Sequence, residues 1–252
     1  HGQLSHGSRY FDLRPRRSGG GTVYICHGEI QGPPLAEVLD DVKRFMQEEN
    51  GELVILKFSH FDGFDDQGYA ELAEQVTGAL RDWLYPGGAR LAEVPLGDLL
   101  GGKGVVYVVM DTTYYAENRT PGIYVYRDST KCNVKKGDLR VLDLYSNTTS
   151  YPEMEQQQLQ LFADFDGICH PDEDPAKACD QGETCDLFLL SWTLTPVSGV
   201  WLWAQDADRN LAAGVQKTAN PNGHGRRINV VFLDYVQYAR PVDVCLCLNG
   251  LA

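Results

Sequence analysis

The chain has 252 residues, which is enough for one α/β barrel or for two small domains. Hydrophobic residues make up 43% of the sequence and charged residues 23%, proportions that are typical of a globular protein with a sizeable core. The 35 acidic and 22 basic residues give a formal net charge of −13, which argues against nucleic acid as a partner and against broad adhesion to anionic membranes. Any recognition of a phosphate group must therefore be local.

Short apolar segments alternate with segments of helical periodicity along the chain. Strands are predicted at residues 9–13, 23–26, 53–58, 105–109, 139–144, 187–192 and 229–235. Helices are predicted at residues 35–46, 67–84 and 152–165. Because the strands are apolar on both faces and separated by helices, we expect them to pair in parallel, in a doubly wound sheet or in a closed barrel. We expect a single domain over residues 1–252, since the sequence shows neither an internal repeat nor a linker.

Three of the seven cysteines, Cys169, Cys179 and Cys185, lie in one polar stretch. In a secreted protein such a stretch is expected to hold a disulfide, and we predict one disulfide there with its pairing left open. A zinc site is the alternative, but the spacing matches no familiar zinc finger. Cys245 and Cys247 stand two positions apart in an apolar segment and are predicted to be buried thiols, with a disulfide from one of them to another cysteine as the alternative.

Further features of the sequence bear on localisation. Asn118 and Asn147 each begin an Asn-x-Thr glycosylation sequon. No apolar run is long enough to span a membrane as a helix, and the chain begins at His1, from which we expect a mature or trimmed product. Together with the predicted disulfide, these features predict a secreted, extracellular glycoprotein.

Polar residues collect where the predicted strands end, which is the functional edge of an α/β barrel. They are Arg9, Asp12, Arg14, His27, Lys57, Ser59, His60, Asp111, Asp143, Tyr145, Ser191 and Asp234. Each of them taken alone has a structural explanation, as a turn residue, a helix cap or a satisfied buried group. Their concentration at consecutive strand ends shifts the balance toward a site.

Five segments in order resemble the X-domain of the phosphatidylinositol-specific phospholipases C. They are GSRYFDLRP (7–15), VYICHGE (23–29), LVILKFSHF (53–61), VLDLYS (141–146) and NVVFLDYV (229–236). The resemblance extends from Gln3 to the C-terminus and implies a TIM-type (β/α)8 barrel, regular or distorted. It also implies a phosphodiesterase in which the inositol 2-hydroxyl attacks phosphorus and expels diacylglycerol, leaving a cyclic phosphodiester.

The resemblance assigns catalytic roles to residues of the first two motifs. His27 matches the general acid that protonates the leaving alkoxide, a role that suits an imidazole. Arg14 stands where the calcium-dependent enzymes carry an acidic metal ligand, so it implies a metal-independent reaction without a cofactor, in which a guanidinium contacts the phosphate. Asp12 matches the acidic partner expected to order Arg14 or the imidazole.

The later motifs imply contacts with a phosphoinositide or related phosphodiester headgroup and a transient contact with the membrane surface. Asp143 and Tyr145 match an inositol-binding pair. Ser59 falls where the bacterial enzymes carry a Lys, and His60 beside it is the residue expected to compensate. For Trp201 and Trp203 the sequence leaves two interpretations, a patch of aromatic residues at the membrane interface or residues of the core.

One part of the family pattern has no counterpart here, namely the opening strand with its general-base His. Asp234 matches the carboxylate that orients that His. We therefore expect the first strand to lie outside this chain and the chain as given to be a poor catalyst. The alternatives are a non-catalytic barrel that binds a headgroup or a glycan, and a phosphodiesterase for another headgroup; the fold alone does not decide among them.

Overall fold

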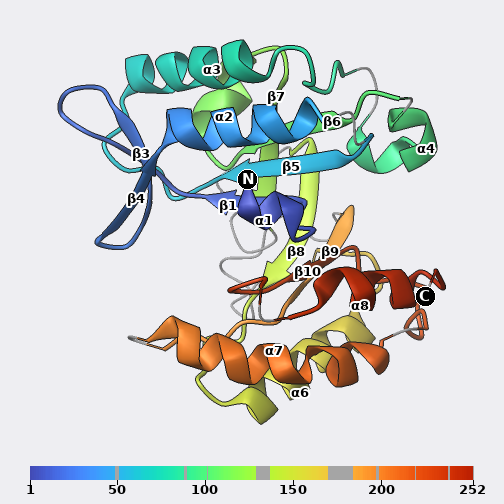
Figure 1. The fold of residues 1–252 in the computed structure, drawn as a ribbon. Helices are drawn as coiled ribbons and strands as arrows, with labels where there is room; N and C mark the ends of the chain where they lie inside the picture. The colour runs from blue at the N-terminus through green and yellow to red at the C-terminus, as the bar shows by residue number, and fades with distance from the viewer. Residues whose placement is uncertain are drawn as a thin grey trace. The chain divides into compact units, whose positions relative to one another are not determined.

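The computed structural model describes residues 1–48, 51–87, 90–100, 102–128, 137–169, 184–196, 199–218, 220–237 and 239–251. The backbone divides into two compact units, the first containing His1–Arg127 and the second Arg140–Ala252 (Figure 1). The expectation of a single domain over residues 1–252 stays a prediction.

The first unit combines parallel strands, helices and a small antiparallel sheet. Its elements are α1 (Gly2–Ser5), β1 (Tyr10–Leu13), β2 (Pro15–Arg17), β3 (Val23–His27), β4 (Ile30–Pro34), α2 (Leu35–Met46), β5 (Leu53–Phe58), α3 (Asp66–Leu80), the 3-10 helix η1 (Leu91–Glu93), α4 (Leu96–Leu99), β6 (Val105–Met110), α5 (Thr113–Glu117) and β7 (Ile123–Asp128). Strands β1, β5, β6 and β7 lie side by side in that order and are parallel. Strands β2, β3 and β4 form a separate antiparallel sheet.

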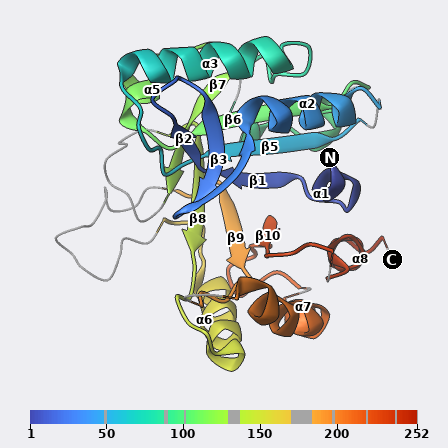
Figure 2. The same cartoon turned by 60° about the vertical axis from the view of Figure 1, so that its left-hand side comes forward.

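The two faces of the parallel strands carry different residues, because successive side chains of a strand point to opposite faces. One face is apolar and packs against α2 and α3, which both lie on the same side of β1 and β5 (Figure 2). On β5 this face consists of Val54, Leu56 and Phe58. The alternate residues include Lys57, whose ammonium lies 4.5 Å from the centroid of the Tyr126 ring. This second face also carries Asp12, the direct partner of Lys57 on β1.

The predicted strands and helices of this unit are found, with two differences. The predicted strand 23–26 is β3, which pairs antiparallel with β2 and β4 in a separate sheet and not in parallel as expected. The second difference lies at a helix end. The predicted helix 67–84 is α3, which ends at Leu80. Past Leu80 the chain turns, and the backbone of Trp83 accepts a hydrogen bond from Val106 (2.7 Å). Residues 81–84, the last turn of the predicted helix, therefore lie outside α3, and their backbone bonds to β6. Strand β7 was not predicted.

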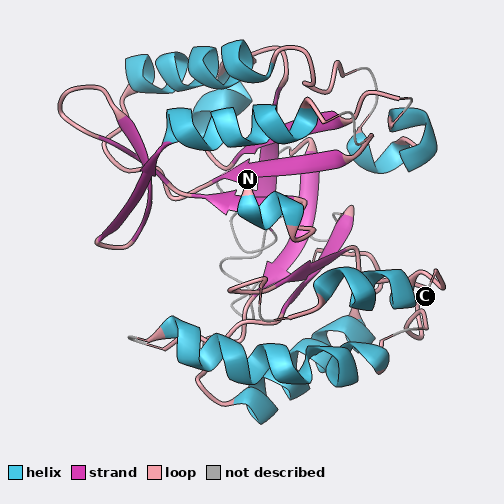
Figure 3. Cartoon of the chain, viewed as in Figure 1, coloured by secondary structure: helices cyan, strands magenta, loops and turns pink. Residues whose placement is uncertain are grey.

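The second unit repeats the alternation of strand and helix (Figure 3). Its elements are β8 (Leu139–Leu144), α6 (Tyr151–Asp164), β9 (Leu187–Ser191), α7 (Val200–Gln216), β10 (Val230–Phe232) and α8 (Pro241–Leu248). Strand β9 pairs in parallel with β8 and with β10. Trp192, which follows β9, is fully buried, and its indole Nε1 donates to the carbonyl of Ala207 on α7 (3.0 Å). These contacts fix α7 over the strands.

The cysteines confirm one prediction and contradict another. Cys169 and Cys185 form a disulfide, whereas Cys179 lies outside the described residues. Cys245 and Cys247 are free and exposed, so the prediction of buried thiols is wrong. The reason is that α8 carries the apolar segment but contains no buried residue along its length. Among the described residues, no helix is long and apolar enough to cross a membrane.

Candidate active site

Asp12, near the carboxyl end of β1, is the centre of a network of charged and polar side chains. Its Oδ2 accepts a hydrogen bond from Nε of Arg14 (2.9 Å), and its Oδ1 accepts one from the hydroxyl of Ser59 (2.7 Å). The ammonium of Lys57 lies 3.7 Å from Oδ1. Burial by itself would raise the pKa of Asp12, but Lys57, the Ser59 hydrogen bond and Arg14 outweigh it and lower the pKa. Asp12 is therefore an ionised carboxylate at neutral pH.

Backbone hydrogen bonds hold a segment on each side of Arg14. The segment that follows β5 runs alongside β1 and β2, and β3 lies on the other side. The bonds run from Ser59 N to Leu13 O (3.0 Å), Asp62 N to Pro15 O (3.1 Å), Arg17 N to Asp62 O (2.9 Å) and Cys26 N to Arg14 O (2.8 Å). His60 lies on the first neighbouring segment, and His27 directly follows Cys26 on the second. Main-chain pairing thus places the two segments that carry these histidines beside the backbone of residues 13–15.

Arg16 ties these neighbouring segments together through its side chain. Its Nε donates to Oδ2 of Asp62 (2.7 Å), and a terminal nitrogen donates to the carbonyl of Gly28 (2.7 Å). Gly28 follows His27 and has a φ of +56°, a left-handed conformation that favours glycine. The side chain of His27 itself is exposed to solvent. Exposure of this kind suits a group that exchanges a proton with a bound molecule.

Ser59 and His60 form the second arm of the network. Ser59 is fully buried, and its hydroxyl lies 2.9 Å from Nδ1 of His60. His60 has a φ of +54°, which is uncommon for a residue other than glycine. The same left-handed conformation recurs at Asn147 (φ +45°) and Tyr235 (φ +50°). These residues follow β8 and β10, so each of the three lies just past the carboxyl end of a parallel strand, where backbone strain often marks a functional site.

Lys57 was noted among the polar residues at the strand ends, but the sequence reasoning assigned it no role in the site. Its side chain is buried between Asp12 and the ring of Tyr126. The resemblance placed the missing lysine of the bacterial enzymes at Ser59, two positions further along the same face of the strand. The sequence did contain a signal for this role. Lys57 stands in the apolar strand LVILKF, and an ammonium group is rarely buried without a partner of opposite charge.

The remaining predicted residues belong to the second unit. Asp143 lies near the carboxyl end of β8, and Tyr145 follows it with 61% of its surface exposed. Asp234 follows β10. Its charge raises the pKa of the buried Asp208 on α7, after the larger effect of burial itself. Asp143 thus lies within β8 and Asp234 just past β10, the two strands that pair with β9. The placement of these residues relative to Arg14 stays a prediction.

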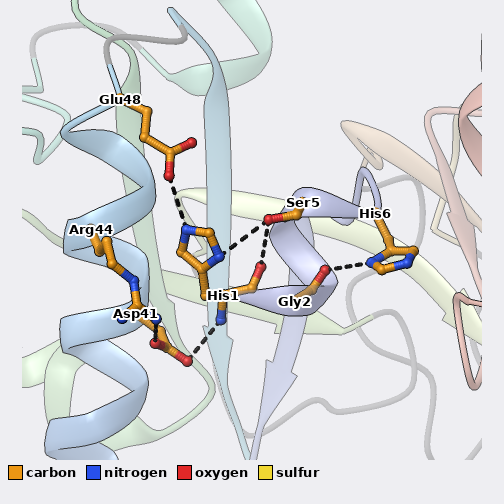
Figure 4. Close-up of polar contacts among 7 residues, drawn as sticks. All are labelled: His1, Gly2, Ser5, His6, Asp41, Arg44 and Glu48. Carbon is orange, nitrogen blue, oxygen red and sulfur yellow. Dashed lines mark hydrogen bonds and ion pairs between the residues drawn. The ribbon is translucent and has the colours of Figure 1, made fainter.

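The two other histidines described in the first unit are occupied by local contacts (Figure 4). The terminal ammonium of His1 donates to Asp41 on α2 (2.7 Å), and its Nε2 lies 3.0 Å from Glu48. Nδ1 of His6 bonds to the carbonyl of Gly2 (2.8 Å). In the described part of the chain, no group of three or more His, Cys, Asp or Glu side chains is arranged to hold a metal ion. Metal independence itself stays a prediction.

Comparisons with known proteins agree with the resemblance found in the sequence. No family model matches the chain. Over 78 residues it is 33% identical to the PI-PLC X domain-containing protein 3 of Bos taurus, covering 30% of this chain and 24% of that protein. Over 87 residues it is 38% identical to the variant-surface-glycoprotein phospholipase C of Trypanosoma brucei brucei, covering 33% of this chain and 24% of that protein. The matched part thus spans about a quarter of the length of these relatives.

Solved structures show the same fold over nearly the whole chain. A phosphatidylinositol-specific phospholipase C from Staphylococcus aureus matches 93% of this chain and 76% of its own, with a TM-score of 0.60 at 19% identity. The enzyme from Listeria monocytogenes matches 99% of this chain and 80% of its own, with a TM-score of 0.55 at 16% identity. The chain is therefore similar, over about a third of its length, to proteins of the phosphatidylinositol-specific phospholipase C X-domain family, and it takes the TIM-type α/β barrel fold of the bacterial enzymes.

Proposed function

We propose that the protein is a phosphodiesterase that cleaves phosphatidylinositol-type lipids, including glycosylated ones, without a metal ion. The observation that carries this proposal is the ion pair of Arg14 with Asp12, next to the strand that ends in His27 and is bonded to the Arg14 carbonyl through Cys26. Arg14 is held by a bond from Nε to the carboxylate, which leaves the terminal guanidinium nitrogens to face a phosphate. The names of the sequence relatives, an X-domain protein and a phospholipase C, support this reaction class.

Each residue has a role in the proposed reaction that follows from its charge or from its capacity to transfer a proton. Arg14 neutralises the charge that develops on the phosphoryl oxygens, which is the role a cation takes in phosphoryl transfer. His27 donates a proton to the diacylglycerol oxygen as the bond from phosphorus to that oxygen breaks. Lys57 keeps Asp12 ionised, so that Asp12 can hold Arg14 in place. Asp143 and Tyr145 are proposed to contact the inositol ring. Asp234 is proposed to orient the general-base imidazole of the family's opening strand, which accepts the proton of the attacking 2-hydroxyl.

The experiment is cleavage of phosphatidylinositol vesicles, followed by phosphorus NMR with and without a chelator. We expect a cyclic inositol phosphate to appear and its rate of formation to be insensitive to the chelator. Arg14→Lys should lower kcat by about 100-fold or more, because lysine cannot reproduce the bidentate geometry. Arg81→Lys, at an exposed arginine past the end of α3, is the matched control. Chelator-sensitive turnover would refute the role of Arg14, and binding of inositol phosphate without turnover would favour a headgroup-binding barrel instead.

A lipid substrate requires contact with a membrane, and the second unit offers a surface for it. Trp201, Leu202 and Trp203 form the first turn of α7 and are 47%, 55% and 38% exposed. Three consecutive apolar residues cannot all face outward from a helix packed along its length, so this turn projects past the core, which begins at Ala204. Aromatic residues favour the bilayer interface. One solved structure of the Staphylococcus aureus enzyme concerns its membrane binding, which supports the same property here.

We further propose that the protein is secreted and glycosylated. The disulfide between Cys169 and Cys185 fits an oxidising compartment. Asn118 and Asn147, the first residues of the two sequons, are both exposed. Treatment of the protein isolated from its natural source with an N-glycosidase should lower its mass, and the Asn118→Gln and Asn147→Gln variants should show which sequon carries the glycan.

A further inference from the structure

The turn that follows His27 places one apolar side chain next to the imidazole. Strands β3 and β4 form a hairpin in which His27 and Ile30 are direct partners, with Gly28 and Glu29 in the turn between them (Figure 1). Residues directly opposite each other in an antiparallel pair point to the same face, with Cβ atoms about 4.5–5.5 Å apart. The side chain of Ile30 therefore lies beside that of His27.

Both side chains of this pair are exposed. Ile30 is 73% exposed, and among the described large hydrophobic residues only Leu251 is exposed to the same extent. His27 is exposed as well. Single exposed isoleucines are common on protein surfaces, but this one stands opposite a proposed proton donor. Removal of apolar surface from water is favourable, so a ligand with carbon chains gains affinity when it covers Ile30.

Local contacts hold the tip of the hairpin in place. A terminal nitrogen of Arg16 donates to the carbonyl of Gly28 in the turn (2.7 Å). Further along β4, a Cβ at Gly32 would lie 2.6 Å from the carbonyl oxygen of Ile25 on β3, so the two backbones approach closely at this glycine. The turn and the strand pairing thus fix where Ile30 lies in the hairpin.

We infer that Ile30 contacts the diacylglycerol part of the substrate and thereby favours a lipid as the leaving group. This inference rests on the function proposed above, in which His27 gives its proton to the diacylglycerol oxygen as the bond from phosphorus to that oxygen breaks. A proton donor lies within hydrogen-bond distance of the atom that it protonates. The glycerol carbons attached to this oxygen therefore lie beside His27, on the face of the hairpin where Ile30 presents its apolar side chain.

The test compares two substrates that share the inositol phosphate headgroup and differ in the leaving group. One is dihexanoyl phosphatidylinositol below its critical micelle concentration, and the other is methyl inositol phosphate, whose leaving group is methanol. In the full-length protein, Ile30→Thr should lower kcat/KM for the dihexanoyl lipid by about 10-fold, because a polar side chain replaces the apolar contact. Its kcat/KM for the methyl diester should equal that of the wild type. Ile30→Val keeps a branched apolar side chain and is the matched control.

The ratio of the two kcat/KM values separates a contact with the leaving group from a general effect on the hairpin. An unchanged ratio in Ile30→Thr, whether both values fall together or neither falls, would overturn this inference alone. Sedimentation with phosphatidylcholine vesicles is the second measurement, and we expect no change. Weaker vesicle binding with an unchanged ratio would make Ile30 a membrane contact and would equally overturn the inference. Absence of lipid cleavage by the wild-type protein would overturn the proposed function and this inference with it.

Discussion

The ammonium of Lys57 lies 3.7 Å from Oδ1 of Asp12, so one carboxylate serves two cations at once. Arg14 occupies the other oxygen, at 2.9 Å. The lysine is buried, and an ammonium group in such a place depends on its counter-charge. Its ammonium also lies over the ring of Tyr126, 4.5 Å from the ring centroid. Lys57 and Asp12 therefore stabilise each other inside the unit, and Arg14 is held as a consequence.

Lys57→Met keeps the length of the side chain but removes the charge. The variant should lose about 3–5 kcal/mol of unfolding free energy, because it leaves the carboxylate of Asp12 without one of its partners. Urea denaturation measures this loss, with Lys103→Met, at an exposed lysine, as the control. The double variant Lys57→Met with Asp12→Asn should recover much of the loss. Equal stability of Lys57→Met and the wild type would show that the ion pair contributes nothing.

Asp208 gives the protein a stability that depends on pH. The residue is 5% exposed, and in the described part of the structure neither carboxylate oxygen has a hydrogen-bond partner. Burial and the charge of Asp234 raise its pKa from 3.8 to about 7. The folded protein therefore binds this proton more tightly than the unfolded chain does, so stability should fall as the pH rises from about 4 to about 7. Above that range the contribution is constant.

Asp208→Asn should remove this decline, because the amide stays neutral at every pH. The check is urea denaturation at pH 5 and pH 8, where the variant should gain stability relative to the wild type only at the higher pH. Asp206→Asn, at an exposed position of the same helix, is the control. A variant that is destabilised equally at both pH values would contradict the assignment of a neutral carboxyl.

The disulfide should contribute measurably to stability. Cys169 and Cys185 are 16 residues apart, and closing a loop of this size lowers the entropy of the unfolded chain by an amount worth about 3 kcal/mol. Replacing both residues by Ser should cost about that much in thermal or chemical denaturation. The exposed thiols Cys245 and Cys247 provide the control, since Ser at those positions should leave stability unchanged. An unchanged melting temperature on loss of the disulfide would contradict the prediction.

The first turn of α7 should govern lipid binding rather than chemistry. Trp201→Ala with Trp203→Ala should weaken sedimentation with phosphatidylcholine vesicles, because each exposed ring contributes apolar contact with the interface. Turnover of a monomeric, soluble substrate should remain as in the wild type. Leu96→Ala, at a leucine that is 56% exposed on α4, is the control. If vesicle binding does not change, the turn is not the docking surface.

The sequence predicted much of the fold because periodicity is a local property. The strand at 53–58 is continuous and apolar, and it is found at those residues as β5. Exposure was harder to predict, since it depends on what lies opposite in the folded chain. Trp201 and Cys245 both stand in apolar segments, yet both are exposed. Composition alone does not distinguish such segments from core.

In the site, contacts between residues close in sequence were likewise easier to predict than contacts between residues on different strands. The resemblance implied that Asp12 orders either Arg14 or the imidazole, and the structure shows its contact with Arg14, two positions further along the chain. The contact of Lys57 with Asp12 depends on the register of β5 against β1, in which these two residues are direct partners. A single sequence does not reveal such a register. The bonds from Ser59 to Asp12 and to His60 depend on it too.

The segments beside Arg14 are joined by main-chain hydrogen bonds, from Ser59 to Leu13, from Asp62 to Pro15 and from Cys26 to Arg14. Side-chain identity has little influence on bonds of this kind, so the backbone frame should tolerate exchange of the residues it presents. Arg14, His27 and His60 can then change separately over generations while their Cα positions stay in place. A related chain could acquire a metal ligand or a different headgroup preference through one or two substitutions, with no rebuilding of the sheet beneath them.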